Sequence, residues 1–180
     1  DLTKWDQQIT DYGQSVAFIL YFWEHYGGDN IITDLVDSRS QGTTGISNTL
    51  SAHGYTDDFT DCFRNWASAN HMDDTDIDEG QYGYDSMNID MKLTATHSSF
   101  PTSNSGSVQG WAADYIHLTG GDDDLTINFD GSSGDTFLVN VLVFGNGLIA
   151  NVVEEMELDS GQDGEVIIEG FGSSYDDVVL

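Results

Sequence analysis

Hydrophobic residues follow two different spacings along this chain. Up to about residue 70 they recur every three or four residues, as in amphipathic helices, and from about residue 87 they alternate with polar residues, as in strands. An acidic, glycine-containing stretch, residues 73–86, separates the two patterns. We therefore expect an α+β chain, with a helical part (1–72), an acidic linker (73–86) and an antiparallel β domain (87–180) that forms a jelly-roll-like sandwich.

The longest apolar run predicts a helix around which the helical part is organised. Residues 16–23 are all apolar, and Asp11 and Gln14 ahead of them form a capping-box pattern. Gly27 and Gly28 after the run supply the left-handed residue that ends a helix. Because the run is apolar on every side, we expect other elements to cover it all round.

Three further helices are predicted before the acidic stretch. Asp29 and Thr56 are the expected caps of the first and the third, and the second carries Ile46 and Leu50. The third has the clearest amphipathic pattern of the chain, with apolar residues at i, i+3, i+4, i+7 and i+8: Phe59, Cys62, Phe63, Trp66 and Ala67. Cys62 is the only cysteine, so we expect a small core residue, with no disulfide and no cysteine-based zinc site.

The β part is predicted from alternation and turn residues. Met87 to Ala95 alternate as a first strand, and Asn146-Gly147 between two apolar runs is the strongest hairpin signal. Further strands are expected at 111–118, 125–129, 137–144, 148–153, 165–168 and 175–180. The last of these ends in Val178, Val179 and Leu180 without a polar cap, which suggests an open edge able to pair with a neighbouring sheet.

The net charge of the chain limits the classes of molecule that it can bind. It has 4 Lys and Arg against 32 Asp and Glu, a net charge of −28, which excludes nucleic acid and anionic membrane surfaces as partners. The excess of carboxylates fits a high-salt environment, an extracellular protein that loads calcium, or simply a soluble acidic surface. No stretch has the roughly 18 to 20 apolar residues of a membrane span, and the start lacks the pattern of a signal peptide. We expect an extracellular or cell-surface protein, mature or cut from a longer precursor.

Among the acidic residues, one group has the spacing of a calcium loop. Asp74, Asp76 and Asp78 alternate, and Asp85 stands at the twelfth position. The loop departs from the EF-hand because Glu79 occupies the position where glycine makes the tight turn, and Asp85 replaces the bidentate glutamate. A bound calcium ion and a solvated run of charges are both open interpretations. A single glycine-aspartate segment at 120–125 favours an acidic β-turn over a calcium repeat.

Several common enzyme motifs are missing from the sequence. It contains no His-Glu-x-x-His, no Gly-x-Ser-x-Gly, no phosphate-binding glycine loop and no dinucleotide-binding fingerprint, and its five histidines are scattered singly. Four familiar enzyme classes therefore lack their usual motif in this chain.

A resemblance to a known protein family suggests a function that the motifs above do not indicate. The chain has Tyr12-Gly13, then a helix ending in His-Tyr-Gly-Gly at 25–28, Gly45-Ile46, and an amphipathic helix ending in Trp-Ala-x-Ala-Asn at 66–70 before the acidic stretch. It continues with Phe-Pro-Thr at 100–102 and Gly-Trp-Ala-Ala-Asp-Tyr-Ile at 110–116. This order resembles the region downstream of the zinc-binding helices in secreted hyicolysin-type metallopeptidases of the gluzincin group.

The resemblance implies that the helical part corresponds to the C-terminal lobe of a gluzincin peptidase. The zinc ligands and the general base of such an enzyme would lie before Asp1, so zinc is expected only in a longer precursor and the chain alone is expected to be inactive. Tyr12 matches the tyrosine that in related aminopeptidases donates a hydrogen bond to the oxyanion of the tetrahedral intermediate, a role that suits a phenol at a buried helix start. The alternative for Tyr12 is ordinary packing.

Two functional hypotheses follow. In the first, the chain is the non-catalytic C-terminal portion of a secreted zinc-metallopeptidase-like protein, and its partner is the missing catalytic half, which implies an exposed apolar surface where that half docks. In the second, it is an acidic, calcium-binding extracellular structural protein whose copies join through strand edges into filaments or arrays.

Overall fold

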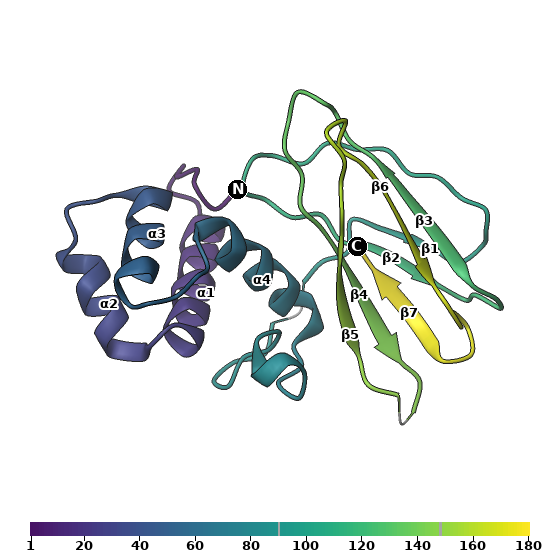
Figure 1. Cartoon of the computed structure of the whole chain (residues 1–180), viewed down its shortest axis with the longest axis horizontal. Helices are drawn as coiled ribbons and strands as arrows, with labels where there is room; N and C mark the ends of the chain where they lie inside the picture. Colours follow the sequence, from purple (N-terminus) through teal and green to yellow (C-terminus); the bar gives the residue numbers. More distant parts are fainter. Residues whose placement is uncertain (90, 148) are drawn as a thin grey trace. The chain divides into compact units, whose positions relative to one another are not determined.

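The computed structural model describes residues 1–89, 91–147 and 149–180, and in them four α-helices are followed by seven β-strands (Figure 1). The α+β class is therefore confirmed. The chain forms two compact units. The first unit comprises Asp1–Asp90 and Val108–Ala113, and the second comprises Met91–Ser107 and Asp114–Leu180.

The first unit contains all four helices: α1 (Ile9–His25), α2 (Gly28–Asp37), α3 (Gly42–Ala52) and α4 (Phe59–Met72). Helix α1 begins earlier than predicted, because Gln8 and not Asp11 is its N-cap. Asp11 lies in the first turn, where its carboxylate accepts hydrogen bonds from the backbone N–H groups of Asp6 at 2.8 Å and Gln8 at 2.9 Å. Asp11 thus satisfies donors at the helix start from inside the helix.

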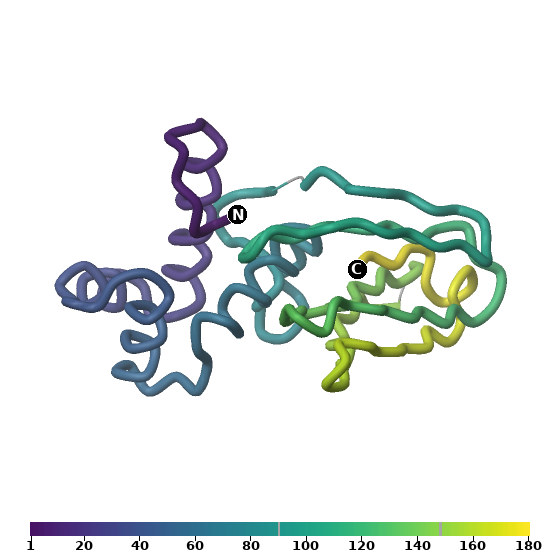
Figure 2. The backbone as a smooth tube through the Cα atoms, turned by 90° about the horizontal axis from the view of Figure 1, so that it is seen from above, coloured from purple at the N-terminus to yellow at the C-terminus, as the bar shows by residue number. Residues whose placement is uncertain are grey.

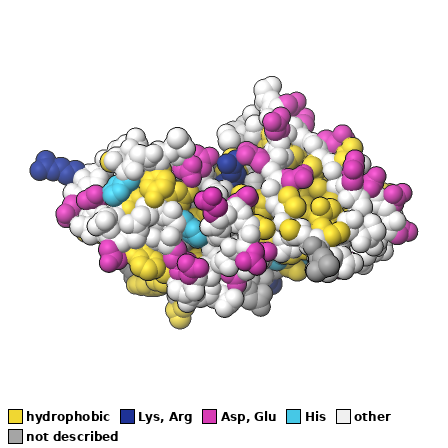
Figure 3. Space-filling model, turned by 60° about the horizontal axis from the view of Figure 1, so that its bottom comes forward, with side chains coloured by type: hydrophobic (Ala, Val, Ile, Leu, Met, Phe, Trp, Pro, Cys, Tyr) yellow, Lys and Arg dark blue, Asp and Glu magenta, His cyan; other side chains and the backbone are white. Residues whose placement is uncertain are grey.

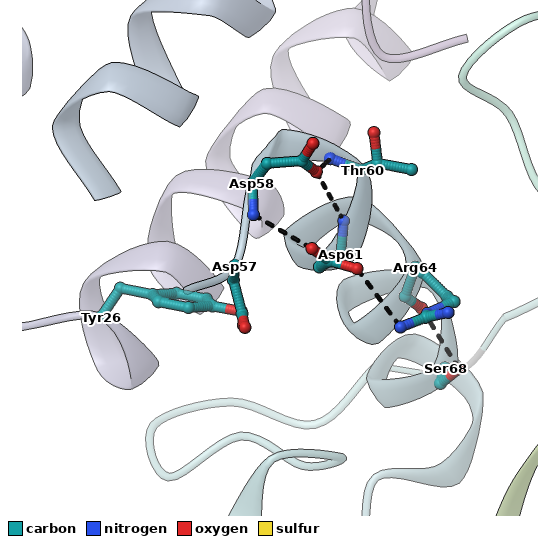
Figure 4. Close-up of polar contacts among 7 residues, drawn as sticks. All are labelled: Tyr26, Asp57, Asp58, Thr60, Asp61, Arg64 and Ser68. Atoms are coloured by element: carbon teal, nitrogen blue, oxygen red, sulfur yellow. Dashed lines mark hydrogen bonds and ion pairs between the residues drawn. The ribbon is translucent and has the colours of Figure 1, made fainter. Parts of the chain in front are cut away.

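Helix α4 begins with a capping box whose N-cap, Asp58, lies two residues after the predicted cap, Thr56 (Figure 4). The Asp58 carboxylate accepts from the backbone N–H groups of Thr60 at 2.6 Å and Asp61 at 3.2 Å, and the Asp61 carboxylate accepts from the N–H of Asp58 at 3.1 Å. Thr56 as the cap is therefore wrong. Arg64, one turn along the helix, donates to the other carboxylate oxygen of Asp61 at 3.4 Å.

The core of the first unit is mainly aromatic. Phe18, Tyr21 and Phe22 of α1 are buried against the apolar stripe of α4. The rings of Phe18 and Trp66 meet edge to face with centroids 5.5 Å apart. Leu50 of α3 and Ile31 of α2 are fully buried and complete the cluster. Burial of these large rings supplies most of the driving force for folding this unit.

The acidic stretch 73–86 is folded into the first unit. Its two ends meet where the N–H of Asp74 donates to the carbonyl of Tyr82 at 3.0 Å. Tyr84 is buried, and its hydroxyl donates to the side-chain oxygen of Asn70 on α4 at 2.5 Å. The stretch is thereby attached to α4.

The first predicted strand is largely wrong. The structure has a strand only at β1 (Ala95–His97), while Met87 and Ile89 pack on the helical core without forming a strand. Asp90, which the prediction also included, lies outside the described residues. At Met87 and Ile89 the alternation therefore reflects packing on the helical core and not a sheet.

The second unit contains two sheets (Figure 1). The larger has the strand order β1-β2-β7-β4-β5, and the smaller pairs β3 with β6. The strands after β1 are β2 (Ile116–Thr119), β3 (Leu125–Asp130), β4 (Val139–Gly145), β5 (Val152–Met156), β6 (Asp163–Ile168) and β7 (Tyr175–Val179). Nine buried side chains from the strands of both sheets, together with Phe171 between β6 and β7, form one hydrophobic cluster, with Val141 and Val178 at 0% exposure.

The larger sheet is mixed, which differs from the predicted antiparallel domain. Strands β1 and β2 run parallel, with Ala95 opposite Ile116, and the other pairs are antiparallel. The predicted hairpin at Asn146-Gly147 is confirmed as the antiparallel β4–β5 pair, although its connection runs from 146 to 151. Leu148, which we placed at the start of the second strand, lies outside the described residues.

The last strand does not form an edge of the sheet. Strand β7 pairs with β2 on one side and β4 on the other, and Val178 and Val179 are buried. The predicted open edge at the end of the chain is therefore wrong. Three consecutive apolar residues mark an interior strand here, because both faces are covered.

Candidate functional site

Helix α1 carries an exposed row of large hydrophobic side chains, which we call the α1 stripe: Ile9, Tyr12, Val16, Ile19 and Trp23. Ile9 is 91% exposed and Val16 is 64% exposed, although both occupy a helix that also supplies the core. Single exposed hydrophobic residues are common on proteins, but a continuous row of them indicates an interaction surface.

The stripe is exposed because the other helices cover only one face of α1. Phe18, Tyr21 and Phe22 point into the core, whereas the stripe occupies the remaining face. Figure 2 shows the first turns of α1, in purple, projecting beyond α2, α3 and α4. The prediction that this helix is covered all round is therefore wrong within the described part of the chain.

Tyr12 belongs to the stripe. It is 55% exposed, and its ring meets that of Trp5 at an interplanar angle of 67° with centroids 4.8 Å apart. The predicted buried helix start is thus an exposed one, with two aromatic rings in contact on the surface. The hydrogen bond from Tyr12 to an oxyanion stays a prediction that depends on a second polypeptide segment.

Charge is absent from the stripe and present at its ends. No Asp, Glu, Lys or Arg occurs from residue 12 to residue 23, in a chain in which 20% of residues are charged. At the far end, the indole N–H of Trp23 donates to the carboxylate of Asp29 at 2.8 Å. Figure 3 shows how acidic side chains elsewhere are scattered among exposed hydrophobic ones. Core positions of protein interfaces have this depletion of charge and enrichment of aromatic residues.

The predicted calcium residues are not gathered into a site. The Asp74 carboxylate accepts from the N–H of Asp76 at 2.9 Å, Asp78 opens a 3₁₀ turn, and the N–H of Asp85 donates to the Glu24 carboxylate at 3.1 Å. Across the described residues, no three His, Cys, Asp or Glu side chains are arranged to hold a metal ion. Calcium binding by this stretch stays a prediction.

Two other features noted in the sequence, the glycine-aspartate segment and Cys62, have structural roles. In the glycine-aspartate segment, the Asp124 carboxylate accepts from the N–H of Gly170 at 2.7 Å and so ties two loops together. Cys62 is fully buried in the helical core, and burial raises the pKa of its thiol. A buried, protonated thiol is a core residue and not a reactive nucleophile, as predicted.

Comparisons with known proteins add no assignment: no family model, no curated protein and no solved structure matches this chain. Among the described helices, none combines the length and the apolar character needed to cross a membrane.

The α1 stripe is visible in the sequence as apolar residues separated alternately by three and four positions. It was missed because the residues between them, such as Phe18 and Phe22, are apolar as well.

Proposed function

We propose that this chain is the non-catalytic, downstream part of a secreted zinc-metallopeptidase-like protein, and that the α1 stripe packs against the part carrying the zinc-binding motif. The observation that carries the proposal is the stripe. The resemblance to hyicolysin-type peptidases implies a docking surface of this kind. The helical unit then acts as a scaffold lobe for a catalytic lobe.

The chain's own residues do not fit a zinc site. It contains no His-Glu-x-x-His, and its described residues hold no cluster of three metal-binding side chains. We therefore derive no hydrolytic step for the chain alone. In a joined protein, Tyr12 is our candidate catalytic group in this chain, because it is exposed within the stripe that the other part would cover.

The first test is native mass spectrometry of the protein from its source, with peptide mapping of any residues that precede Asp1. We expect a segment carrying His-Glu-x-x-His, either continuous with this chain or bound to it, together with one zinc ion. Finding copies of this chain alone, without such a segment, would overturn the proposal.

A second test uses variants of the protein that contains both parts. Val16→Asp places a charge in the stripe and is expected to lower peptide hydrolysis at least tenfold, because the two lobes no longer pack. Val36→Asp is the matched control, since Val36 is a 76% exposed valine on α2 outside the stripe. Equal loss in both variants would show that added charge, and not the stripe, is responsible.

The competing proposal is a calcium-dependent structural protein that assembles from its own copies through strand edges. The edges available in the larger sheet are β1 and β5, since β7 is interior. Chromatography before and after a calcium chelator separates the two proposals, because only self-assembly predicts large species that fall apart without calcium.

For the second unit we propose a sandwich of the two sheets. The shared cluster of side chains supports it, since Ile127 of β3 and Ile168 of β6 are buried together with Val141 and Val178 of the larger sheet. Such packing is typical of sandwiches, in which alternate residues of both sheets face inward.

A further inference from the structure

We propose that the occupant of the α1 stripe is an amphipathic helix that lies along α1 at a shallow angle and carries a basic residue where it meets Asp29. The inference rests on the proposed function in one respect, that the stripe is an interface. It goes further by naming the secondary structure and the charge of the partner segment.

The spacing of the stripe specifies a helical partner. Its members stand 3, 4, 3 and 4 residues apart, a mean of 3.5, and on a helix that turns about 100° per residue they fall within an arc of about 80°. A 3.5-residue repeat is the pattern that faces a second helix crossing at about 20°. A strand laid across α1 would meet a compact patch and would not need a row over four turns.

The length of the stripe sets the length of the partner. From Ile9 to Trp23 the helix rises about 21 Å at about 1.5 Å per residue, which calls for a partner helix of about four turns. Aromatic residues stand near both ends, with Trp5 and Tyr12 in contact at the start and Trp23 at the finish. Large aromatic anchors of this type contribute most of the affinity in protein interfaces.

Charge complementarity specifies one end of the partner. The Trp23 indole fixes the Asp29 carboxylate beside the last member of the stripe, and Asp29 is exposed. An opposite charge placed there gains from proximity to a carboxylate that is already oriented. Burying the stripe next to Asp29 without a cation would leave that charge partly desolvated, which is costly.

The same charge disfavours two other occupants. A second copy of the chain would bring another net charge of −28 to the interface, with no basic residue in its own stripe to meet Asp29. A membrane surface that contains anionic lipid would repel the chain. Both are nevertheless outcomes that the experiment below can reveal.

The probe is a synthetic peptide of three heptads with leucine at positions a and d, glutamine and alanine elsewhere, and lysine at both ends, used below the concentration at which it self-associates. An isomer with the same composition but leucine at every second position is the control for an extended partner. Binding to the isotope-labelled full chain is measured by NMR at about 0.5 M KCl, where non-specific attraction is screened.

We expect the heptad peptide to bind with shifts confined to the α1 stripe and its neighbours, and the alternating isomer to bind at least tenfold more weakly. Val16→Asp should weaken binding at least tenfold, whereas Val36→Asp should change it less than twofold. Val16→Ser adds no charge, and its loss of affinity should lie between those of Val16→Asp and Val36→Asp. It is the control for a folding defect in the aspartate variant.

The basic end is tested with Asp29→Asn, which retains an oxygen to accept the Trp23 hydrogen bond. We expect it to weaken binding of the lysine-ended peptide about threefold or more and to leave a glutamine-ended peptide unchanged. Asp37→Asn, an exposed aspartate at the other end of α2, is the matched control.

Several results would overturn the inference. These are no binding, equal binding of the alternating isomer, equal effects of Val16→Asp and Val36→Asp, concentration-dependent dimers that occupy the stripe, or binding to zwitterionic vesicles that Val16→Asp abolishes. Because the probe contains no zinc site, the two proposals can fail separately. If the heptad peptide binds as expected but the protein from its source has no segment carrying His-Glu-x-x-His, the proposed function is refuted and this inference stands.

Discussion

Gly121 lies directly against the ring of Phe171, a residue that is 1% exposed and contacts Phe100 with ring centroids 5.6 Å apart. A Cβ atom on residue 121 would overlap that ring. We expect Gly121→Ala to lower the free energy of unfolding by about 1–3 kcal/mol, because a packed ring has nowhere to move. Urea unfolding measures the change. Gly106→Ala, where a Cβ would meet no atom within 4 Å, should stay within about 0.5 kcal/mol, and equal effects would contradict the packing argument.

Tyr84 attaches the acidic stretch to α4 through its hydroxyl. Asn70, which accepts this bond, is 3% exposed, so removing the hydroxyl leaves a buried polar group with one partner fewer. Tyr84→Phe is expected to cost about 1–3 kcal/mol in the free energy of unfolding. Tyr12→Phe, at a 55% exposed position on the same unit, serves as the control and should be close to neutral. A neutral Tyr84→Phe would mean that the stretch is held mainly by other contacts.

At the scale of single elements, the interior position of β7 has a measurable consequence. Val178 is fully buried between two neighbouring strands, so Val178→Ala should lower the free energy of unfolding by about 2 kcal/mol through lost burial and a residual cavity. Ile167→Ala on β6 removes more atoms from a side chain that is 54% exposed, and it should cost less than about 1 kcal/mol. If the order of the two costs were reversed, β7 would not be the structural centre of the larger sheet.

Elements with one dominant hydrophobic spacing were predictable from the sequence. The four helices and β3, β4, β6 and β7 lie where the spacing placed them, whereas only the ends of the strands predicted at 111–118 and 148–153 fall in β2 and β5. Phe59, Cys62, Phe63 and Trp66 form the buried stripe expected of α4, but Ala67, which we also placed in it, is only partly buried. The predicted caps were displaced. Gln8 caps α1 and Gly27 caps α2, while Asp11 and Asp29, which we predicted as caps, lie in the first turns of these helices. At α4 only the fold selects Asp58 over Thr56.

Contacts between elements were not predictable from local pattern. The parallel pairing of β1 with β2 depends on a long connection, residues 98–115, whose path leaves no periodic trace. The α1 stripe was hidden because a helix that is apolar all round does not reveal which face its neighbours cover. For the same reason the sequence does not reveal that Tyr12 is exposed.

At the scale of the whole molecule, net charge governs the response to salt. A charge of −28 on 180 residues produces repulsion that is relieved on unfolding. Raising KCl from 0.1 M to 1 M shortens the Debye length from about 10 Å to about 3 Å. We therefore expect the free energy of unfolding, measured in urea, to rise with KCl. A flat or falling dependence would show that the carboxylates are already neutralised by bound ions.

Comparing two divalent salts at equal concentration separates calcium binding from charge screening. If residues 74–85 hold calcium, 10 mM CaCl₂ should stabilise the chain more than 10 mM MgCl₂, because calcium accepts six to eight oxygen ligands from a flexible loop and magnesium does not. For a dissociation constant of about 1 mM, the gain in the free energy of unfolding over that in magnesium is about 1.4 kcal/mol.

The double substitution Asp76→Asn with Asp78→Asn should abolish that gain. Asp122→Asn with Asp123→Asn removes the same charge from an exposed turn and should preserve it. Equal stabilisation by both cations in the unsubstituted chain would leave screening as the whole effect, and the acidic stretch would then be a folded, solvated part of the helical unit held in place by Tyr84.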